Sequence, residues 1–381
     1  MEYRYFNNAG SGMMSNDTFD TIVNHMRLEM QYGAYKAAII QEKEIKEFYK
    51  YSARLLNAES SEEIAFIDSA SRGWNLVMYG LSVTSNTSIV TLESEYGTNL
   101  ITIYDIANKT GCSVTVIKCH EDGSFNLLDV EAALSKGECI LAVSHVAAQG
   151  AIENPVYELG ILAEKYKAIY IVDGCQACGQ IPINVQEMKC DVYITAGRKW
   201  LCGPRGTGIL YVKRGSQFPS PQIDLSTSDL VFDNNSKVIG IKTVESAKRF
   251  ELWEKNVASL LGLSNAIKEC LDLGLPRIQD GIISKTIKIR EAICNNPKLT
   301  LVGKKDAQIG NASFYTNSEA LERYIKVLFD KNGFIISCMC DWDCPLSFPK
   351  NNVKYIFRIT PHHYTPSEEV REMCECIRNI R

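Results

Sequence analysis

Lys199 is the residue of this sequence whose neighbours most strongly suggest chemistry. It stands between Arg198 and Trp200, and a turn rich in glycine and proline and an apolar stretch, Ile209 to Val212, follow it. A lysine amine is nucleophilic only when its ammonium form is disfavoured, and both desolvation and a nearby cation have that effect. The two neighbours can supply both effects, so the sequence predicts an imine-forming lysine. The alternative is a surface lysine in a turn.

Asp173 ends an apolar stretch, residues 168–172, that has the composition of a buried β-strand. Ligands of open α/β sheets bind at the carboxyl ends of the strands. A carboxylate there can keep the ring nitrogen of pyridoxal 5'-phosphate (PLP) protonated, so that the ring acts as an electron sink. Asp173 and Lys199 together therefore predict a PLP site, although Asp-Gly after a strand is also a common turn.

The segment from Asp173 through Gln176 to Lys199 and Gly208 resembles the signature of the class V aminotransferases, a group of fold-type I PLP enzymes. The resemblance covers nearly the whole chain and implies an α/β fold, in which a large domain with a mostly parallel seven-stranded sheet is joined to a smaller C-terminal α/β domain. The implied boundaries are 15–255 for the large PLP-binding domain, and 1–14 with 256–381 for the small domain.

The same resemblance implies the partners of the chain and the roles of its site residues. The substrate is expected to be an amino acid, and the expected assembly is a homodimer with shared active sites, in which the segment around Trp253 approaches the partner's cofactor. The cofactor phosphate is expected at the start of a helix, where free N–H groups and small hydroxyl side chains suit an anion. The residues implied to bind the cofactor or to act in catalysis, beside Asp173 and Lys199, are Ser69, Ala70 and Ser71 at the phosphate, Tyr96 stacked on the ring, His145 near the ring, and Gln176 at the phenolic oxygen.

Substrate binding is assigned by resemblance to two further places. Arg358 is expected to bind the α-carboxylate, because a guanidinium offers a planar, bidentate match to that group. Asn8 and Ala9 lie in a segment that resembles the lining of the substrate mouth.

The sequence departs from the cysteine desulfurases of this family around the phosphate. Arg198 stands where they have histidine, Ala196 stands where they have serine, and the threonine expected from the partner subunit is replaced within 249–254. Arg198 or Arg205 is the expected substitute. Together with Glu-Tyr-Gly around Tyr96, these features resemble the ergothioneine-pathway C–S lyases, which cleave hercynylcysteine sulfoxide. That resemblance predicts C–S cleavage by β-elimination from a cysteine conjugate or sulfoxide, with Lys199 as Schiff base and general base.

Three alternatives remain open at the level of sequence. The same active-site residues serve a class V aminotransferase or an epimerase in natural-product metabolism. A cysteine desulfurase or selenocysteine lyase would need a thiol nucleophile, for which Cys338, Cys340 and Cys344 are candidates although alignment places Trp342 at that position. The third alternative is a non-catalytic protein with the PLP fold. A zinc site at the three cysteines is disfavoured because no second paired-cysteine motif is present.

Composition agrees with an enzyme that acts on small molecules. The 381 residues are 45% hydrophobic and 23% charged, and the formal net charge of −4 gives no reason to expect nucleic acid or an anionic membrane as a partner. No apolar stretch approaches the roughly 20 residues of a membrane span, and no signal peptide is recognisable at the start. We expect a cytoplasmic protein, with its 14 cysteines reduced and no metal bound.

The order of expected elements supports the fold. Residues 17–57 predict amphipathic helices, and from 64 to 212 strand signals alternate with helical stretches, which indicates a largely parallel sheet covered on both faces. Ala247 to Asp272 predicts one long helix that leads into the smaller domain.

Overall fold

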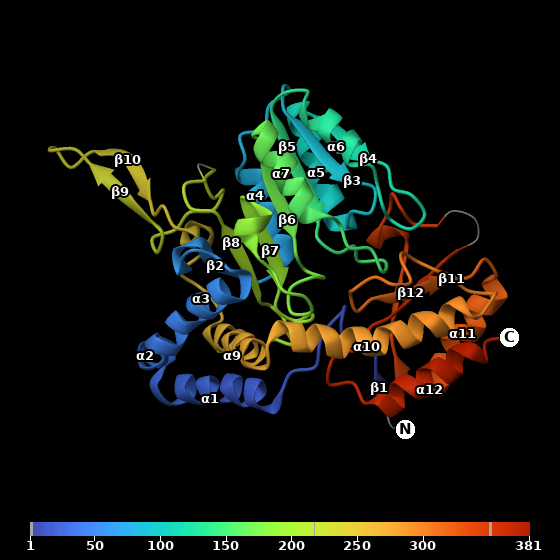
Figure 1. The fold of residues 1–381 in the computed structure, drawn as a ribbon. Coiled ribbons are helices and arrows are strands. Elements are labelled where there is room, and N and C mark those ends of the chain that lie inside the picture. The colour runs from blue at the N-terminus through green and yellow to red at the C-terminus, as the bar shows by residue number, and fades with distance from the viewer. Residues whose placement is uncertain (1–2, 217, 350–352) are drawn as a thin grey trace.

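A seven-stranded sheet forms the centre of the computed structural model, which describes residues 3–216, 218–349 and 353–381 (Figure 1). The strand order is β2-β8-β7-β6-β5-β3-β4. Strand β8 pairs antiparallel with both of its neighbours, and the remaining pairs are parallel. The mostly parallel seven-stranded sheet predicted from the sequence is therefore confirmed. Its strands are β2 (Ile64–Ile67), β3 (Ser88–Leu92), β4 (Ser113–Ile117), β5 (Cys139–Ser144), β6 (Ile169–Asp173), β7 (Val192–Ala196) and β8 (Gly208–Val212).

The topology brings the chemically interesting loops to one edge of this sheet. Because β2 and β7 both run antiparallel to β8, they run parallel to each other, and their carboxyl ends lie at the same edge as those of β3, β5 and β6. Strand β8 begins at that edge, since Gly208 pairs with both Ile67 and Ala196. The loops after β2, β3, β5, β6 and β7 therefore meet there, as expected for the ligand site of such a sheet.

Helices cover both faces of the sheet, and strands β2, β3, β5, β7 and β8 are buried along their whole length. Apolar side chains on both sides of these strands pack against the helices, which explains why the strands appear as continuous hydrophobic runs in the sequence. The covering helices are α4 (Ala70–Gly80), α5 (Gly97–Thr110), α6 (Leu127–Leu134), α7 (Val156–Tyr166) and α8 (Val185–Met188).

The N-terminal helices pack on a long helix from the second half of the chain, as Figure 1 shows. They are α1 (Asn16–Tyr32), α2 (Ala34–Ile40) and α3 (Glu42–Leu56), and α1 and α3 contact α9 (Val257–Leu273), which is followed by α10 (Leu275–Cys294). A short 3-10 helix, η1 (Ser61–Glu63), leads from α3 into β2.

The single helix predicted for Ala247 to Asp272 is wrong. A 3-10 turn, η2 (Ala247–Phe250), is followed by irregular backbone, and α9 begins only at Val257. The side chain of Asn256 caps that start, accepting the Ser259 N–H at 2.8 Å. Asparagine is a strong N-cap because its side chain satisfies a free N–H of the first turn, so the helix starts there.

A second, four-stranded antiparallel sheet in the order β11-β12-β15-β14 carries the C-terminal part of the chain. Helices α10 and α12 pack beside it, and the N-terminal strand β1 pairs in parallel with β13. The division into two domains at residue 255 stays a prediction. The elements of this part are β1 (Arg4–Tyr5), β11 (Thr300–Leu301), β12 (Ala312–Tyr315), α11 (Glu319–Lys331), β13 (Phe334–Ile335), β14 (Ser337–Met339), η3 (Asp341–Asp343), β15 (Ile356–Ile359) and α12 (Ser367–Arg378).

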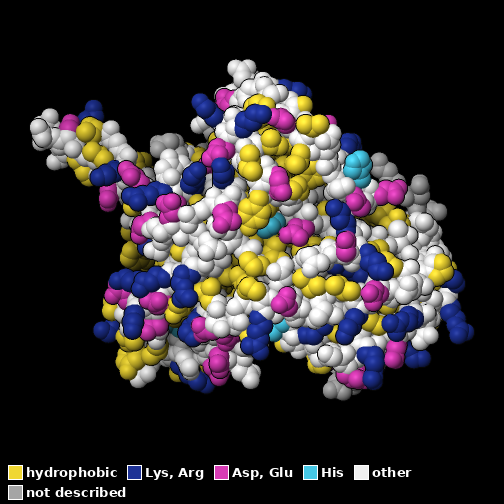
Figure 2. Space-filling model, in the orientation of Figure 1, with side chains coloured by type: hydrophobic (Ala, Val, Ile, Leu, Met, Phe, Trp, Pro, Cys, Tyr) yellow, Lys and Arg dark blue, Asp and Glu magenta, His cyan; other side chains and the backbone are white. Residues whose placement is uncertain are grey.

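A β-hairpin, β9 (Ser228–Phe232) and β10 (Val238–Thr243), projects away from the rest of the molecule at the upper left of Figure 1. Apolar side chains are exposed along it, among them Leu230, Phe232 and Ile239. Figure 2 shows hydrophobic atoms on this arm and at the α1–α2 corner. Among the helices of the described residues, none combines the length and the apolar character needed to cross a membrane.

Candidate active site

A cavity of about 320 Å³ opens at the edge where the strand ends meet. Residues at the ends of β5, β6 and β7 line it, together with residues that follow β2, β3, β5, β6 and β7. Most of the residues that the sequence assigned to a cofactor are thus brought together although they are far apart in the chain. The lining consists of Asp68, Ser69, Ala70, Ser71, Tyr96, Asn99, Ser144, Val146, Ala148, Asp173, Cys175, Gln176, Ala196, Arg198, Lys199, Arg205, Gly206 and Thr207.

Lys199 reaches this cavity from the loop between β7 and β8. Burial lowers the pKa of its amine, and the cations Arg198 and Arg358 act in the same direction, whereas Cys175 and Asp173 oppose them. The net direction is the one that imine chemistry needs, because it enlarges the neutral fraction of the amine. The backbone of Lys199 is held by the N-terminal segment, where a side chain on Gly12 would overlap the Lys199 carbonyl oxygen.

Asp173 lies at the end of β6 with its carboxylate facing the cavity. Its Oδ1 accepts the Cys175 N–H at 2.9 Å, and its Oδ2 accepts a hydrogen from Asn99 Nδ2 at 2.8 Å. These two contacts fix the plane of the carboxylate. Each oxygen keeps lone-pair capacity for a cationic N–H donor in the cavity.

Tyr96 stands directly before α5 and is half-buried in the cavity wall. Burial raises the pKa of its hydroxyl, so the ring is neutral at physiological pH. The next residue is Gly97, where a side chain would overlap the backbone carbonyl of Trp342. The small residue at this position therefore allows the loop around η3 to close over Tyr96.

The opposite end of the cavity has the features of an anion site. Ser69 is the N-cap of α4, its Oγ accepting the Arg72 N–H at 3.2 Å, and Ala70 and Ser71 form the first turn. Arg205 lines the same cavity from the β7–β8 loop. A helix N-terminus with small hydroxyl side chains and a nearby guanidinium suits a phosphate. Arg198, the other expected phosphate ligand, donates from Nη1 to the Gly10 carbonyl.

Arg358 lies on β15 and is 6% exposed. Its Nη1 donates to the Ala148 carbonyl at 2.8 Å and its Nη2 to Ser337 Oγ at 3.4 Å, while its buried Nε has no acceptor among the described residues. A buried donor without an acceptor is costly, so this N–H is a ready site for a ligand carboxylate. Burial lowers the pKa of the guanidinium to about 10, which leaves it charged at neutral pH.

Gln176 lines the cavity, but its amide is already engaged. Its Nε2 donates to the Ala9 carbonyl at 3.0 Å, and its Oε1 accepts the indole N–H of Trp200 at 3.1 Å. One amide hydrogen remains for a ligand oxygen. Asn8 and Ala9 are not in the cavity lining, and Asn8 donates from Nδ2 to the Thr360 carbonyl at 2.7 Å. The two residues therefore join Gln176 to the strand that carries Arg358.

His145 lies behind the cavity rather than in its lining. The ring is 2% exposed, and its Nδ1 is 3.2 Å from the hydroxyl of Tyr193. Burial lowers the pKa of the imidazole to about 3, so the ring is neutral. Its backbone N–H donates to the Asp173 carbonyl at 2.8 Å. His145 therefore supports the backbone of Asp173 from behind the cavity.

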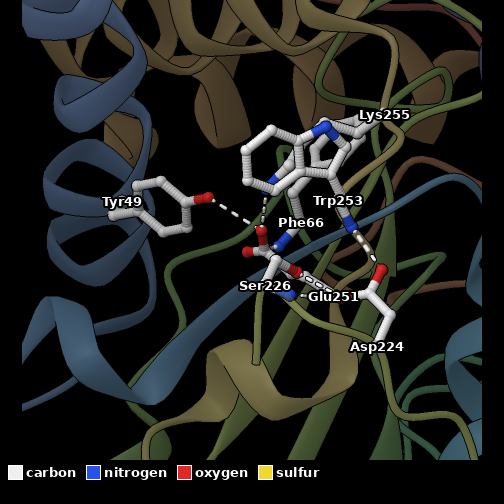
Figure 3. Close-up of polar contacts among 7 residues, drawn as sticks. All are labelled: Tyr49, Phe66, Asp224, Ser226, Glu251, Trp253 and Lys255. Carbon is white, nitrogen blue, oxygen red and sulfur yellow. Dashed lines mark hydrogen bonds and ion pairs between the residues drawn. The ribbon is translucent and has the colours of Figure 1, made fainter. Parts of the chain in front are cut away.

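The segment 249–254, in which the sequence lacks the expected threonine, is anchored by Glu251 (Figure 3). The buried carboxylate accepts the Phe66 N–H at 2.8 Å, the Tyr49 hydroxyl at 3.0 Å, and a hydrogen from the ammonium of Lys255. The neighbouring Trp253 is held through its backbone N–H and exposes 55% of its surface. A rigid segment therefore presents a large apolar side chain to the outside.

The three C-terminal cysteines lie around η3. Cys338 is exposed, Cys340 is partly buried and Cys344 is fully buried. Burial raises the pKa of all three thiols, to about 12 for Cys344. Trp342 stands between them, 76% exposed. Within the ranges that the structure describes, no group of three or more His, Cys, Asp or Glu residues is arranged to hold a metal ion.

The sequence analysis gave no role to eight of the lining residues, which are Asp68, Asn99, Ser144, Val146, Ala148, Cys175, Gly206 and Thr207. Behind them lies Glu95, which was also missed and is described below. Asn99 and Glu95 stand close to Tyr96 in sequence, and that proximity to a candidate site residue was the only signal that could have found them. Thr207 lies between two glycines, as many ordinary loop residues do, so its sequence context did not indicate a site.

The fold and the site together define a fold-type I PLP enzyme: a buried lysine amine, a carboxylate at a strand end and an anion site at a helix N-terminus line one cavity. Arg358 is not in that lining, but it contacts the lining residue Ala148. Each group suits one part of PLP or of an amino acid. Comparison with known families agrees, since the model of the family described as aminotransferase class-V matches residues 4–373. The chain belongs to this family and is a PLP-dependent enzyme, as predicted.

Curated relatives and solved structures refine the comparison. A cysteine desulfurase of Salmonella dublin is 28% identical over 305 residues, covering 78% of this chain and 74% of its own length. One from Salmonella agona is 27% identical over 332 residues, covering 84% and 81%. The apo structure of a cysteine desulfurase from Thermococcus onnurineus matches with a TM-score of 0.88 at 24% identity, covering 99% of this chain and 94% of that one.

A complex of the cystine C–S lyase C-DES with its product, cysteine persulfide, is also similar in fold. It matches with a TM-score of 0.84 at 19% identity, and covers 99% of this chain and 98% of that one.

Proposed function

We propose that this enzyme cleaves a C–S bond of a cysteine-derived amino acid by β-elimination. Support comes from the cavity, which a lysine amine of lowered pKa lines and next to which Arg358 contacts Ala148, while the cysteine among the described lining residues is Cys175. The cavity cysteine, Cys175, is buried and its pKa is raised well above the ordinary value. This combination suits proton abstraction followed by loss of a sulfur leaving group, and it carries the proposal.

The residues have separate tasks in this scheme. Arg358 Nε would bind the substrate carboxylate, and the Lys199 amine would take the Cα proton as general base. Bound PLP supplies an electron sink for the charge that develops at Cα. Asp173 would accept a hydrogen bond from the ring nitrogen of the bound cofactor, and Tyr96 would cover its ring. Ser69, Ala70, Ser71 and Arg205 bind the phosphate.

The leaving group then determines the products. When the Cα proton has been removed, the C–S bond breaks and sulfur leaves with the bonding electrons. The remaining three-carbon unit hydrolyses to pyruvate and ammonia. A cysteine conjugate or a cysteine sulfoxide provides such a leaving group, and hercynylcysteine sulfoxide is the specific substrate suggested by the sequence pattern around Tyr96 and Arg198.

Cysteine desulfuration is the second candidate, because several curated relatives are named cysteine desulfurase. It would require a thiolate that attacks the substrate sulfur, and the accessible thiol near η3 is Cys338. The two reactions differ in the organic product, since desulfuration of cysteine yields alanine whereas elimination yields pyruvate.

A product assay separates the candidates. We expect pyruvate and ammonia in equal amounts from cysteine conjugates and sulfoxides, without added keto acid, and unchanged rates in Cys338→Ser. Alanine as the main product from cysteine, abolished by Cys338→Ser, would favour desulfuration instead. Turnover that requires a keto acid would identify an aminotransferase and refute the elimination.

We further propose a homodimer that completes the phosphate site. A groove of about 910 Å³, lined by apolar residues of α1, α2 and the Trp253 segment, shares Asp68 and Gly206 with the cofactor cavity. A second copy seated there would reach the phosphate end. Trp253→Glu should therefore give a monomer in analytical ultracentrifugation and weaken PLP binding. A stable dimer with unaltered PLP affinity would contradict this arrangement. The cytoplasmic location stays a prediction from the sequence.

A further inference from the structure

A second buried carboxylate lies behind the one that faces the cofactor. Glu95 follows β3 and is 1% exposed, and it is absent from the cavity lining. Asn99, in the first turn of α5, is also buried but does line the cavity. Two carboxylates, Glu95 and Asp173, are thus enclosed in the same part of the protein, and burial of two negative charges is expensive unless hydrogen bonds compensate.

Asn99 provides the link between them. Its Nδ2 is 2.9 Å from Glu95 Oε1 and 2.8 Å from Asp173 Oδ2. A side-chain amide nitrogen carries two hydrogens, and here each is donated to a different carboxylate. The flipped amide would direct its oxygen at both anions, so the orientation of Asn99 is dictated by its surroundings. Asn99 in turn fixes the Oδ2 atom of Asp173.

Glu95 is held from the other side by further donors. Its Oε1 accepts the Tyr96 N–H at 2.8 Å and a hydrogen bond from the Ser144 hydroxyl, and its Oε2 accepts the Ser144 N–H at 2.7 Å. Every polar contact of this carboxylate among the described residues is with a donor. Glu95 therefore ties the Tyr96 loop to the end of β5 and, through Asn99, to the end of β6.

We infer that Glu95 and Asn99 are positioning residues for Asp173: Asn99 bridges the two carboxylates, and this chain of hydrogen bonds orients the Asp173 carboxylate toward the cofactor's ring nitrogen. The inference rests on the proposed role of Asp173. A cationic ring N–H is stabilised by an anion that cannot rotate away, and the hydrogen bonds behind Asp173 prevent that rotation. The hydrogen bond from the Tyr96 N–H to the Glu95 side chain connects Tyr96, the residue expected to cover the ring, to the same network.

The test measures the protonation of the ring nitrogen directly. Glu95→Gln and Asn99→Leu are reconstituted with PLP labelled with ¹⁵N in the ring, and the ¹⁵N chemical shift, the PLP dissociation constant and the kinetic constants are recorded. Glu322→Gln is a matched control, because Glu322 is also 1% exposed but accepts the backbone N–H groups of Lys354 and Tyr355, at 2.8 and 3.3 Å, instead of a hydrogen from Asn99.

We expect the wild-type protein and the control to show a protonated ring nitrogen. In both network variants the resonance should move toward the unprotonated position, and kcat should fall by on the order of 10-fold with little change in KM, as is common when a supporting hydrogen bond is removed. Variants that lose thermal stability but keep the wild-type ¹⁵N shift would overturn the inference, because Glu95 would then serve only to fold the loop.

Further outcomes distinguish a failure of the positioning role from a failure of the proposed function. If Glu95→Gln does not fold, Asn99→Ala decides the question, since it removes both donors and keeps a good helix former in α5. If the wild-type protein itself shows no imine-bound PLP or an unprotonated nitrogen, the proposed function fails. If both network variants keep the ¹⁵N chemical shift of the wild type and release pyruvate normally, only the positioning role is refuted.

Discussion

The two ends of the cofactor cavity are built on different principles. At the ring end, Asp173, Asn99 and Glu95 are buried and joined by hydrogen bonds within one chain. At the phosphate end, Ser69, Ser71 and Arg205 are exposed, and the cavity adjoins the groove beneath Trp253.

The difference shows which part of the site is ready before any ligand binds. A buried, fully bonded network holds its geometry without help, whereas exposed hydroxyls and a flexible arginine take up a fixed arrangement only when an anion or another protein surface orders them. We therefore expect mutations at the ring end to reduce catalysis, and mutations at the phosphate end to reduce mainly the retention of PLP.

The largest effect is expected for Lys199→Ala, which affects both ends because it removes the covalent link. Absorbance of the imine should vanish, and turnover should fall by roughly 1,000-fold or more, since both nucleophile and base are lost. Spectrophotometry and borohydride trapping followed by mass spectrometry will show this. Lys285→Ala is a suitable control, because Lys285 is another partly buried lysine of lowered pKa but contacts the His362 carbonyl outside the cavity. An imine that survives in Lys199→Ala would refute the central assignment.

Asp173→Asn should produce the next largest loss. The amide cannot stabilise a protonated ring nitrogen as a carboxylate does, and we expect kcat to fall by on the order of 100-fold while PLP still binds. Steady-state kinetics at saturating PLP will measure the effect. If the variant instead loses PLP, and the protein that still holds PLP has a normal kcat, the expected difference between the ring end and the phosphate end is contradicted.

Arg358→Lys tests the substrate side. A lysine keeps the charge but lacks the planar pair of donors, and a charge-assisted hydrogen bond of about 1.5–3 kcal/mol corresponds to a 10- to 100-fold loss in kcat/KM. The loss should appear mainly in KM, because carboxylate binding is present before and during the reaction. An unchanged KM would exclude Arg358 as the carboxylate ligand.

Arg205→Ala tests the phosphate end. We expect the dissociation constant of PLP to rise by about 10-fold, as for one charge-assisted bond, with kcat restored when PLP is in excess. Fluorescence titration of apoenzyme will measure it, with Arg323→Ala as a control for loss of an exposed arginine. A fall in kcat that excess PLP does not restore would show that the phosphate end also controls catalysis.

The smallest expected effect is a dependence of stability on pH. Burial and the charge of Asp173 raise the pKa of Glu95 from 4.5 to about 7 in the folded protein. The folded state then binds more protons than the unfolded state between these values, so the contribution of Glu95 is full below pH 4.5 and is lost as pH rises through 7.

Apo Glu95→Gln lacks this titration. The difference in melting temperature, wild type minus variant, should therefore decrease by about a few degrees between pH 4.5 and pH 7.5. Calorimetry of the two apoproteins checks it. A difference that stays constant or increases with pH would show that Glu95 is ionised in the folded state throughout this range.

Much of the site was predictable because its residues follow strands. Apolar runs ending at Leu92, Ser144 and Asp173 indicate buried strands, and the edge where they end is where a sheet of this kind binds ligands. Lys199 and Arg358 were found through their local motifs. The break between η2 and α9 was not predicted, because the residues after Phe250 are compatible with a helix. In the fold, Glu251 instead accepts hydrogen bonds from Phe66 of β2 and Tyr49 of α3, and these contacts hold the segment outside a helix.

Sequence by itself determined the chemical groups and the sheet that carries them, because strand composition and the motifs around Asp173 and Lys199 are local properties. Only the tertiary structure decided which of those groups meet. It joined Asn99 to Asp173 across 74 positions of the chain, engaged Arg198 with the Gly10 carbonyl, and placed His145 behind the cavity. Such pairings depend on where side chains point after packing, and residue identity alone does not determine that direction.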